Sequence, residues 1–294
     1  MSQFNLRVMT FNLLTATKKQ RSHPWRLRKR NIARIITALG PDVVGTQEAN
    51  FRQLRELAEL LPEYDFHGEG NLGSDMAHSD KNWYCATFFR RDRVRQLDAP
   101  GHSDTLWLSP TPEIPASTFN LGTRPRLVTW NRFELLGTGR EFIFGTTHLE
   151  AVNPWHRKRS ADLLRRYVSA RVEELGADIP VFLTGDFNAV ADSPEIRAMA
   201  ESRPGLEPLY DAWAEVQAGD RPDDSADGAT FRGLGLRDRV GRKLLGPRRI
   251  DYVFFRPRPL VRSVSRIDYA DLEHRQQALP SDHYPVVAEF ELAG

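Results

Sequence analysis

Five polar side chains follow apolar, strand-like segments of the sequence, at the point where each segment ends. They are Asn12, Glu48, His148, Asp186 and Asn188. An ionised carboxylate beside a core strand is costly unless it is paired or bound to a metal ion. Ligands of α/β proteins also tend to bind beyond the ends of strands. Four segments that end in this way therefore predict one shared site at an edge of the sheets.

The segment GDFN, residues 185–188, is the most informative of these. Positions i and i+2 of a strand share a face, so Asp186 and Asn188 point the same way while Phe187 turns toward the core. Gly185 leaves room for the close approach of another group. A carboxylate and a carboxamide side by side can orient a water molecule and hold a phosphoryl oxygen or a hard metal ion. The alternative is a turn in which the two side chains cap the strand.

The C-terminal region adds an imidazole and two more carboxylates. Asp251 lies in an apolar strand and needs a partner there, and Asp282 and His283 are adjacent between Pro280 and Pro285. Because proline disfavours regular strand pairing, we expect a loop that presents both side chains to one cavity. A carboxylate beside His283, for which Asp251 is the candidate, would make the imidazole a phosphate ligand or a general acid. The alternative is an Asp–His pair at a surface turn.

Oxygen donors dominate the candidate site, and such donors suit Mg²⁺ or Mn²⁺. They are Asn12, Glu48, Asp186, Asn188 and Asp282. The sequence contains no HExxH zinc motif and no P-loop, dinucleotide-binding or serine-hydrolase motif. Nothing in it indicates an organic cofactor. The chemistry that remains is metal-assisted attack of water on phosphorus.

The elements that must position these residues form a mixed α/β pattern. Helical periodicity occurs at 26–39, 51–61, 157–175 and 194–202. Segments rich in β-branched and aromatic residues and bounded by turn formers predict strands; they span 5–14, 42–49, 83–89, 126–135, 141–150, 179–188, 250–255 and 286–292. Several of these strands are apolar on both faces, which favours two packed sheets with helices outside. No repeat or linker divides the chain, so we expect a single domain over 1–294.

Composition and charge place the chain among globular proteins. Its 294 residues are 40% hydrophobic and 27% charged, with a formal net charge of only +2. No run reaches the roughly 18 apolar residues of a membrane-spanning helix, and the N-terminus lacks the features of a secretory signal. The single cysteine, Cys85, excludes an intramolecular disulfide and a cysteine-cluster metal site. We expect a soluble, cytoplasmic protein, and the sequence does not indicate its oligomeric state.

Short motifs covering nearly the whole chain carry a family resemblance. They are TFNLL (10–14), TQEA (46–49), PRLVTW (125–130), THLE (147–150), GDFN (185–188), RIDYVF (249–254) and SDHYPVV (281–287). In this order they resemble the endonuclease/exonuclease/phosphatase superfamily. The segment WLSPTPEIP, residues 107–115, is similar to the FWLS-TP signature of a bacterial and fungal branch of that superfamily.

The resemblance implies a DNase I-like four-layer α/β sandwich with two packed mixed sheets and a metal-dependent site at one edge. On the matching motifs, Glu48 would be the principal metal ligand, with Asn12 beside it and Asp282 helping to hold the metal. Asp186 would activate the attacking water. Asn188 would orient that water, contact the phosphate and support the transition state.

The same resemblance assigns the cationic groups. His283 would bind or protonate the phosphoryl group, oriented by Asp251, and Arg126 would neutralise phosphate charge. His148 would contact the phosphate or help the leaving group to depart. Relatives often place a glutamate where it pairs with this histidine, and the corresponding residue here is Asn82. An amide can hold His148 in place but cannot favour its charged form as a carboxylate would.

Three functions fit these observations. The first is a phosphodiesterase or nuclease acting on nucleic acid or an oligonucleotide, because the basic runs 18–30 and 237–249 adjoin candidate catalytic segments. Loop aromatics that could stack on bases are Trp25, Trp107, Trp155 and Phe231. The second is a phosphatase or phosphodiesterase for a small phosphate ester, such as a nucleotide, sugar phosphate or phospholipid headgroup. The third is a noncatalytic binding scaffold, which would require loss of catalytic groups that this sequence retains.

Overall fold

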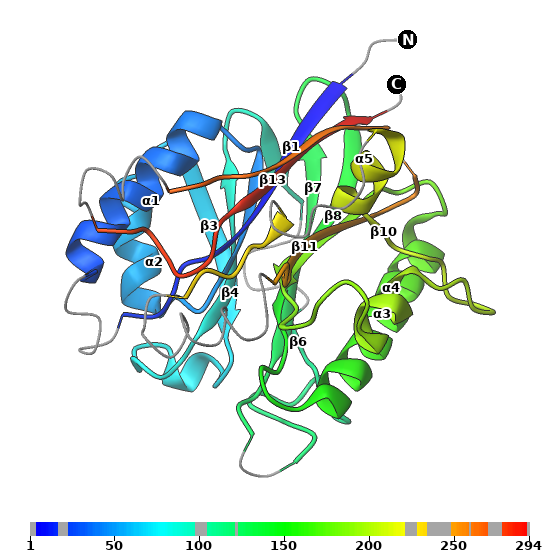
Figure 1. The fold of residues 1–294 in the computed structure, drawn as a ribbon, viewed down its shortest axis with the longest axis horizontal. Coiled ribbons are helices and arrows are strands. Elements are labelled where there is room, and N and C mark those ends of the chain that lie inside the picture. Colours follow the sequence, from blue (N-terminus) through cyan, green and yellow to red (C-terminus); the bar gives the residue numbers. More distant parts are fainter. Residues whose placement is uncertain are drawn as a thin grey trace.

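The computed structural model describes residues 4–16, 23–97, 105–120, 123–220, 228–233, 248–258, 260–269 and 278–292. Two β-sheets pack face to face at the centre, and helices lie on the two outer sides (Figure 1). Each sheet is mixed, with one parallel strand pair among antiparallel pairs. The expected four-layer α/β sandwich is therefore confirmed.

The first sheet brings two of the candidate segments to one edge. Its strands, in spatial order, are β12 (Leu260–Arg266), β13 (Val286–Leu292), β1 (Phe4–Asn12), β2 (Val43–Gln47), β4 (Tyr84–Arg90) and β3 (Tyr64–Gly70). β1 and β2 run parallel, and Asn12 is paired with Gln47. Because the carboxyl ends of parallel strands meet at the same edge of a sheet, Asn12 and Glu48 emerge together.

The second sheet aligns three further candidates in a row. Its strands, in spatial order, are β10 (Tyr210–Asp211), β11 (Asp251–Arg256), β9 (Val181–Asp186), β8 (Arg140–His148), β7 (Leu127–Leu135) and β5 (Val94–Gln96), and β6 (Thr105–Trp107) pairs with β7. β8 and β9 are parallel, with His148 opposite Asp186. β11 is antiparallel to β9, with Asp251 opposite Asp186.

Phenylalanine side chains fill much of the space between the sheets. Phe142, Phe144 and Phe182 of the second sheet are fully buried in a core that includes strands of the first. The rings of Phe182 and Phe290 lie 4.8 Å apart across the interface. Aromatic side chains bury a large apolar area in such a core, so this packing holds the two sheets in a fixed relation.

Toward the candidate site the same space is lined by small polar side chains. The Gln47 amide of β2 donates to Thr146 Oγ1 of β8 at 3.0 Å, and Thr184 Oγ1 donates to the Gly145 carbonyl at 3.0 Å. A Cβ atom on Gly45 of β2 would lie 2.1 Å from Thr184 Oγ1. The sheets can approach this closely only because residue 45 has no side chain.

Local sequence signals set the helix ends. Gly40 follows the first helix with a left-handed φ of 54°, Asn50 opens the second with a capping box, and Pro154 begins the third after its cap Asn153. The helices are α1 (Trp25–Leu39), α2 (Phe51–Ala58), α3 (Pro154–Leu175), α4 (Pro194–Ala200) and α5 (Ala212–Asp220), with a short 3₁₀ helix at Ser74–Met76. α1 and α2 lie on the outer side of the first sheet, and α3 and α4 on that of the second (Figure 1).

Four predicted strands, those that carry site residues, end two residues earlier than expected. Leu14, Glu48 and Asn188 have φ angles of 54°, 68° and 51°. This left-handed conformation is incompatible with a strand and is uncommon for residues other than glycine. The chain therefore leaves the sheet where the candidate side chains occur. The helices expected at 51–61 and 194–202 also end early, at Ala58 and Ala200.

Five strands and one helix had no clear sequence signal. β5, β6 and β10 span three residues or fewer, too short for alternation to be recognised. β3 reads YDFHGEG and carries more polar than apolar residues, and β12 is an edge strand with an irregularity between Val261 and Ser263. α5 lies in a segment for which the sequence predicted neither a helix nor a strand.

Some expectations fall outside what the structure describes. Residues 237–247 of the second basic run and 18–22 of the first are among the undescribed residues. In the described part of the chain, no helix combines the length and the apolar character that crossing a membrane requires. The single domain over 1–294 and the cytoplasmic location stay predictions.

The close approach at Gly45 predicts a specific sensitivity of the fold. Gly45→Ala should lower the free energy of unfolding by about 1–3 kcal/mol, because the added methyl group overpacks the interface between the sheets. Urea denaturation followed by circular dichroism measures this change. Ser263→Ala, on an exposed position of β12, is the control and should stay within about 0.5 kcal/mol of the original protein. Equal stability of the two variants would contradict the proposed contact.

Candidate active site and metal centre

Asn12 links the two halves of the site. Its Nδ2 atom donates to Glu48 Oε1 and to Asp186 Oδ2, both at 3.1 Å, and its Oδ1 atom accepts from the Leu14 amide at 3.0 Å. Glu48 follows a strand of the first sheet and Asp186 ends a strand of the second. Two carboxylates from different sheets thus converge on one buried amide, as the sequence predicted for the strand ends.

The backbone around these carboxylates is held in an uncommon conformation. Glu48 has a left-handed φ of 68°, and its Oε2 atom accepts from the Thr15 amide at 3.3 Å. Asn188 also has a left-handed φ, of 51°, and its Nδ2 atom donates to the Leu149 carbonyl at 3.0 Å. Non-glycine residues in this region cost free energy and cluster at functional sites. These contacts fix the direction of both side chains.

Asp186 lies at the centre of the cluster and is 1% exposed. Its Oδ1 atom accepts from the Asn188 amide at 2.9 Å, and its Oδ2 atom lies 3.5 Å from His148 Nε2 and 3.7 Å from His283 Nε2. Burial is the main cause that raises the pKa of Asp186 to about 7; the charges of Asp251 and Glu48 act in the same direction, and His283 opposes them. The ionised carboxylate therefore needs a compensating positive charge.

His283 is paired with Asp251, as the sequence predicted. Its Nδ1 atom lies 2.9 Å from Asp251 Oδ2, and its ring packs edge-on against Phe231 at 5.0 Å. Burial opposes the charged imidazole, but Asp251 and Asp186 outweigh it, so the pKa of His283 is raised well above its ordinary value. This histidine is a cation held beside Asp186.

His148 has the opposite electrostatic character. Burial lowers its pKa well below the ordinary value, and the positive charges of Arg126, His283 and Arg124 lower it further. Its ring lies nearly parallel to that of Trp83, at an angle of 5° and a centroid distance of 6.4 Å. His148 is therefore neutral at physiological pH.

Asn82 does not hold His148, contrary to the sequence interpretation. Its Nδ2 atom donates to the Gly73 carbonyl at 3.0 Å, and its Oδ1 atom accepts from the Leu72 amide at 2.7 Å. Both ends of the amide are thus used to close the loop between β3 and β4. The neighbour of His148 on this side is Trp83, the residue after Asn82.

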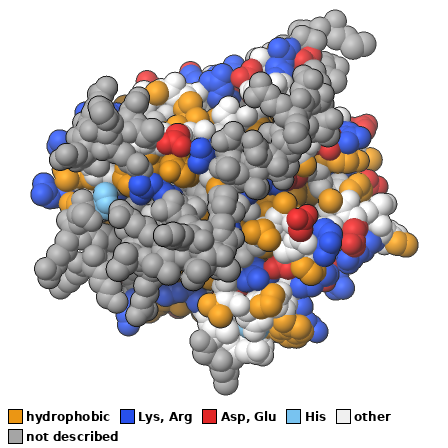
Figure 2. Space-filling model, in the orientation of Figure 1, with side chains coloured by type: hydrophobic (Ala, Val, Ile, Leu, Met, Phe, Trp, Pro, Cys, Tyr) orange, Lys and Arg blue, Asp and Glu red, His pale blue; other side chains and the backbone are white. Residues whose placement is uncertain are grey.

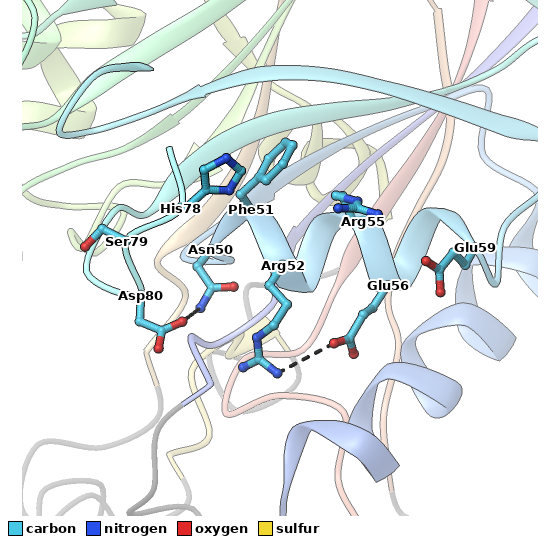
Figure 3. A pocket seen from close by; sticks show the side chains of 9 residues that line it. All are labelled: Asn50, Phe51, Arg52, Arg55, Glu56, Glu59, His78, Ser79 and Asp80. Carbon is cyan, nitrogen blue, oxygen red and sulfur yellow. Dashed lines mark hydrogen bonds and ion pairs between the residues drawn. The ribbon is translucent and has the colours of Figure 1, made fainter. Parts of the chain in front are cut away.

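The polar residues of that loop line a different pocket. His78 packs against Phe51 and Asp80 accepts a hydrogen bond from Asn50, in a hollow of about 250 Å³ beside α2 (Figure 3). This hollow also holds the pair of Arg52 with Glu56. It contains none of the residues predicted for the site.

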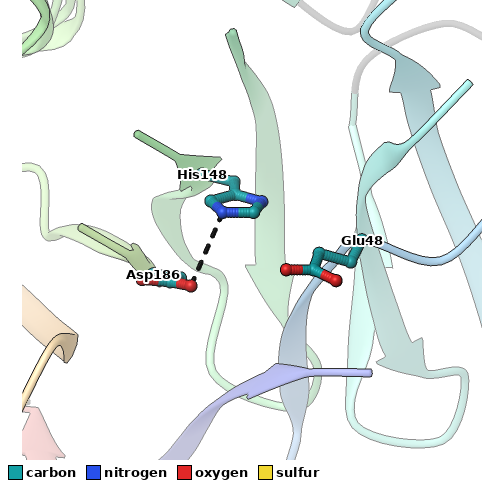
Figure 4. A group of neighbouring side chains, drawn as sticks. All are labelled: Glu48, His148 and Asp186. Atoms are coloured by element: carbon teal, nitrogen blue, oxygen red, sulfur yellow. Dashed lines mark ion pairs between the residues drawn. The ribbon is translucent and has the colours of Figure 1, made fainter. Parts of the chain in front are cut away.

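Among the residues that the structure describes, two groups of side chains have ligand atoms close enough for a metal ion. Glu48, His148 and Asp186 place theirs within 4.8 Å of one another, and Figure 4 shows the two carboxylates on either side of the space below the imidazole. Asp186, Asp251 and His283 form the second group, where the protonated imidazole already supplies positive charge. A hard divalent cation fits the first group, because it prefers carboxylate oxygen and would neutralise two facing charges.

Asp282 lies outside both groups of the described residues. Its Oδ1 atom accepts from Ser281 Oγ at 3.3 Å. Burial raises its pKa to about 6, with His283 opposing this effect and Glu48 adding to it. Its expected part in holding the metal stays a prediction.

Arg126 is paired with a residue that the sequence analysis did not single out. Its Nε atom lies 3.3 Å from Glu150 Oε2, and both side chains are 11% exposed. Arg126 lines a small pocket together with Glu48, His148, Trp83 and a second arginine, Arg124. Glu150 belongs to the THLE motif and Arg124 precedes Arg126 by two residues, so both were visible in the sequence as neighbours of predicted residues.

Comparison with known proteins gives one family. The profile of the Endonuclease/Exonuclease/phosphatase family matches residues 9–283. The crystal structure of an endonuclease/exonuclease/phosphatase from Bacteroides vulgatus is 26% identical, with a TM-score of 0.79 over 99% of this chain and 100% of that one. A mannosyl-6-phosphatase from Bacteroides thetaiotaomicron is also 26% identical, with a TM-score of 0.74 over 97% and 99% of the two chains.

The curated relatives are longer than this chain. Nocturnin of Drosophila melanogaster is 24% identical over 98% of this chain but only 47% of its own length. The chain therefore spans about half the length of the curated relatives that it matches. The FWLS-TP branch suggested by residues 107–115 stays a prediction.

The buried Asp186 carboxylate predicts a dependence of stability on pH and metal. Its pKa of about 7 in the folded chain exceeds the value of about 3.9 of an unfolded chain. Its stabilising contribution is therefore complete at low pH and is lost as the pH rises through about 7. At about pH 8 without metal, Asp186→Asn should raise the midpoint of thermal unfolding. Millimolar Mg²⁺ or Mn²⁺ should raise the midpoint of the original protein far more than that of the variant.

Differential scanning fluorimetry with and without each ion provides both measurements. Asp65→Asn removes an exposed carboxylate that pairs with Arg91, so this control should respond to metal as the original protein does. A metal-induced shift of equal size in Asp186→Asn, or none in the original protein, would show that the cation is not bound at this site.

Proposed function

This chain belongs to the endonuclease/exonuclease/phosphatase family, whose members hydrolyse phosphoester bonds, and we propose that it hydrolyses a small phosphate ester with Mg²⁺ or Mn²⁺ bound between Glu48 and Asp186. The observation that carries the proposal is the convergence of these two carboxylates on the Asn12 amide, within reach of His148. A cation bound there supplies Lewis-acid neutralisation of the phosphoryl group and lowers the pKa of a bound water.

Asp186 and Asn188 are the groups that act on the attacking water in this proposal. With a cation bound, Asp186 would be ionised and would accept a proton from the attacking water. The side-chain amide of Asn188 donates to the Leu149 carbonyl at 3.0 Å, and its backbone amide donates to Asp186 at 2.9 Å. Its side chain is therefore positioned before substrate arrives, which lowers the entropy cost of orienting the water.

The two histidines take different parts. His283 remains protonated beside Asp251 and donates a charge-assisted hydrogen bond to a phosphoryl oxygen. His148 is neutral, so it acts as a hydrogen-bonding group for the phosphate rather than as the acid that protonates the leaving group. Arg126, held by Glu150, supplies positive charge at the same pocket.

Several residues expected to contact nucleic acid are instead structural. Trp25 and Trp107 are buried, and their indole N–H groups donate to Glu56 and to the Asn71 carbonyl. Arg28, in the first basic run, is fully buried and donates to three backbone carbonyls. These side chains cannot stack on bases or face phosphates, which favours a small ester.

A nucleic-acid substrate is the second candidate. It is supported by Trp155, which is 50% exposed and has the Arg159 guanidinium 4.4 Å from its ring centroid, an arrangement suited to stacking on a base. Against it, Lys and Arg side chains are interspersed with Asp and Glu among the described residues on the face shown in Figure 2. The mannosyl-6-phosphatase likeness also favours the small ester.

Turnover with matched variants tests the proposal. With Mg²⁺ or Mn²⁺, a panel of sugar phosphates, nucleotides, aryl phosphates and short single-stranded DNA and RNA should give its highest kcat/KM on a small ester. Asp186→Asn should lower kcat by about 10²- to 10⁴-fold, since it removes the proton acceptor, and Asp65→Asn should leave kcat unchanged. Preference for the oligonucleotides would support the second candidate, and full activity of Asp186→Asn would exclude both.

A further inference from the structure

Arg124 lines the pocket of the proposed site, and it forms no ion pair with any carboxylate in the described part of the chain. It lines the same small pocket as Glu48, Arg126 and His148. Arg126 forms an ion pair with Glu150, whereas among the residues that the structure describes no carboxylate forms an ion pair with Arg124. The pocket therefore has one guanidinium group that forms no ion pair with a described carboxylate, and Glu48 of the candidate metal centre lines the same pocket.

Trp83 and the chain around it hold this guanidinium in place. The Arg124 Cζ atom lies 3.7 Å from the centroid of the Trp83 ring, and Nη1 donates to the Lys81 carbonyl at 2.9 Å. Two hydrogen bonds fix the Trp83 backbone: its amide donates to Asn71 Oδ1 at 2.8 Å, and its carbonyl accepts from the Asn71 amide at 2.9 Å. A cation stacked on an indole ring is stabilised by the ring quadrupole, so Arg124 is positioned before any ligand binds.

The position of Arg124 favours a particular anion. The remaining N–H donors of its planar guanidinium group form a fork whose geometry matches phosphate oxygens. A terminal phosphate has three nonbridging oxygens and nearly two negative charges at neutral pH. A diester has two nonbridging oxygens and one negative charge, and its second ester group offers nothing for a guanidinium to neutralise. A second guanidinium beside Arg126 is therefore useful chiefly for a terminal phosphate.

We propose that Arg124, held on Trp83, binds the phosphate and makes the site selective for phosphate monoesters over diesters. This inference rests on the proposed function and specifies its substrate class. Arg124 contacts the third nonbridging oxygen, the one that a diester lacks, while the remaining groups of the site serve both kinds of ester.

A matched pair of substrates tests the selectivity. p-Nitrophenyl phosphate and bis(p-nitrophenyl) phosphate share a leaving group and differ in the oxygen that Arg124 is proposed to contact. Arg124→Gln should lower kcat/KM for the monoester at least about tenfold, the loss expected for one charged hydrogen bond, and change the value for the diester little. Arg124→Lys should recover part of the monoester activity, because it keeps the charge but loses the fork.

Binding provides a readout that does not depend on turnover. Isothermal titration calorimetry with Mg²⁺ present should show that the original protein binds inorganic phosphate more tightly than dimethyl phosphate, and that Arg124→Gln removes this difference. Arg95→Gln, on β5 beside the far end of β7 and paired with Glu134, is the control and should preserve both affinities.

The outcomes separate this inference from the function on which it rests. If Arg124→Gln lowers kcat/KM equally for the monoester and the diester, or for neither, the proposed selectivity is wrong. The proposed function still stands in that case, provided that Asp186→Asn lowers kcat as expected. Full activity of Asp186→Asn would overturn the hydrolytic mechanism, and the calorimetric comparison would still decide whether Arg124 discriminates a terminal phosphate. An original protein that does not prefer inorganic phosphate to dimethyl phosphate also contradicts the inference.

Discussion

The site depends on one electrostatic constraint, the close approach of two carboxylate groups in a largely buried environment. Glu48 and Asp186 come from different sheets and share the Asn12 amide as a common donor. One amide cannot compensate two carboxylates at low dielectric, so a proton or a cation must complete the arrangement. The aromatic core between the sheets fixes the backbone positions from which the two carboxylates extend.

The same constraint explains why two histidines only a few ångströms from Asp186 differ in charge. His283 has Asp251 at 2.9 Å on its far side and becomes a cation. His148 faces the arginine side of the site and the Trp83 ring, and it stays neutral. Environment rather than residue type thus decides which histidine carries a positive charge and which is neutral. Arg124, which packs on the Trp83 ring, adds a second guanidinium charge to the side of the pocket that His148 faces.

Much of the fold could be predicted from local patterns. Apolar β-branched and aromatic runs located the central strands, and the first helix ends at Leu39 as predicted, because Gly40 readily adopts the left-handed conformation. The third helix begins at Pro154, three residues before the predicted start at 157. β3 and the edge strand β12 could not be predicted, since their residues are held by hydrogen bonds to neighbouring strands rather than by an apolar pattern. The early strand ends at Glu48 and Asn188 were also missed, because a left-handed residue without glycine has no sequence signature.

The sequence by itself determined which groups could do the chemistry: the carboxylates and amides at four strand ends, the histidines of THLE and SDHYPVV, and the family to which these motifs belong. Only the tertiary structure decided their protonation and their partners. It turned Asn82 toward the Leu72 and Gly73 backbone, placed Trp83 beside His148, and paired Arg126 with Glu150. The physical reason is that pKa values and ion pairs depend on burial and on distances between residues far apart in sequence.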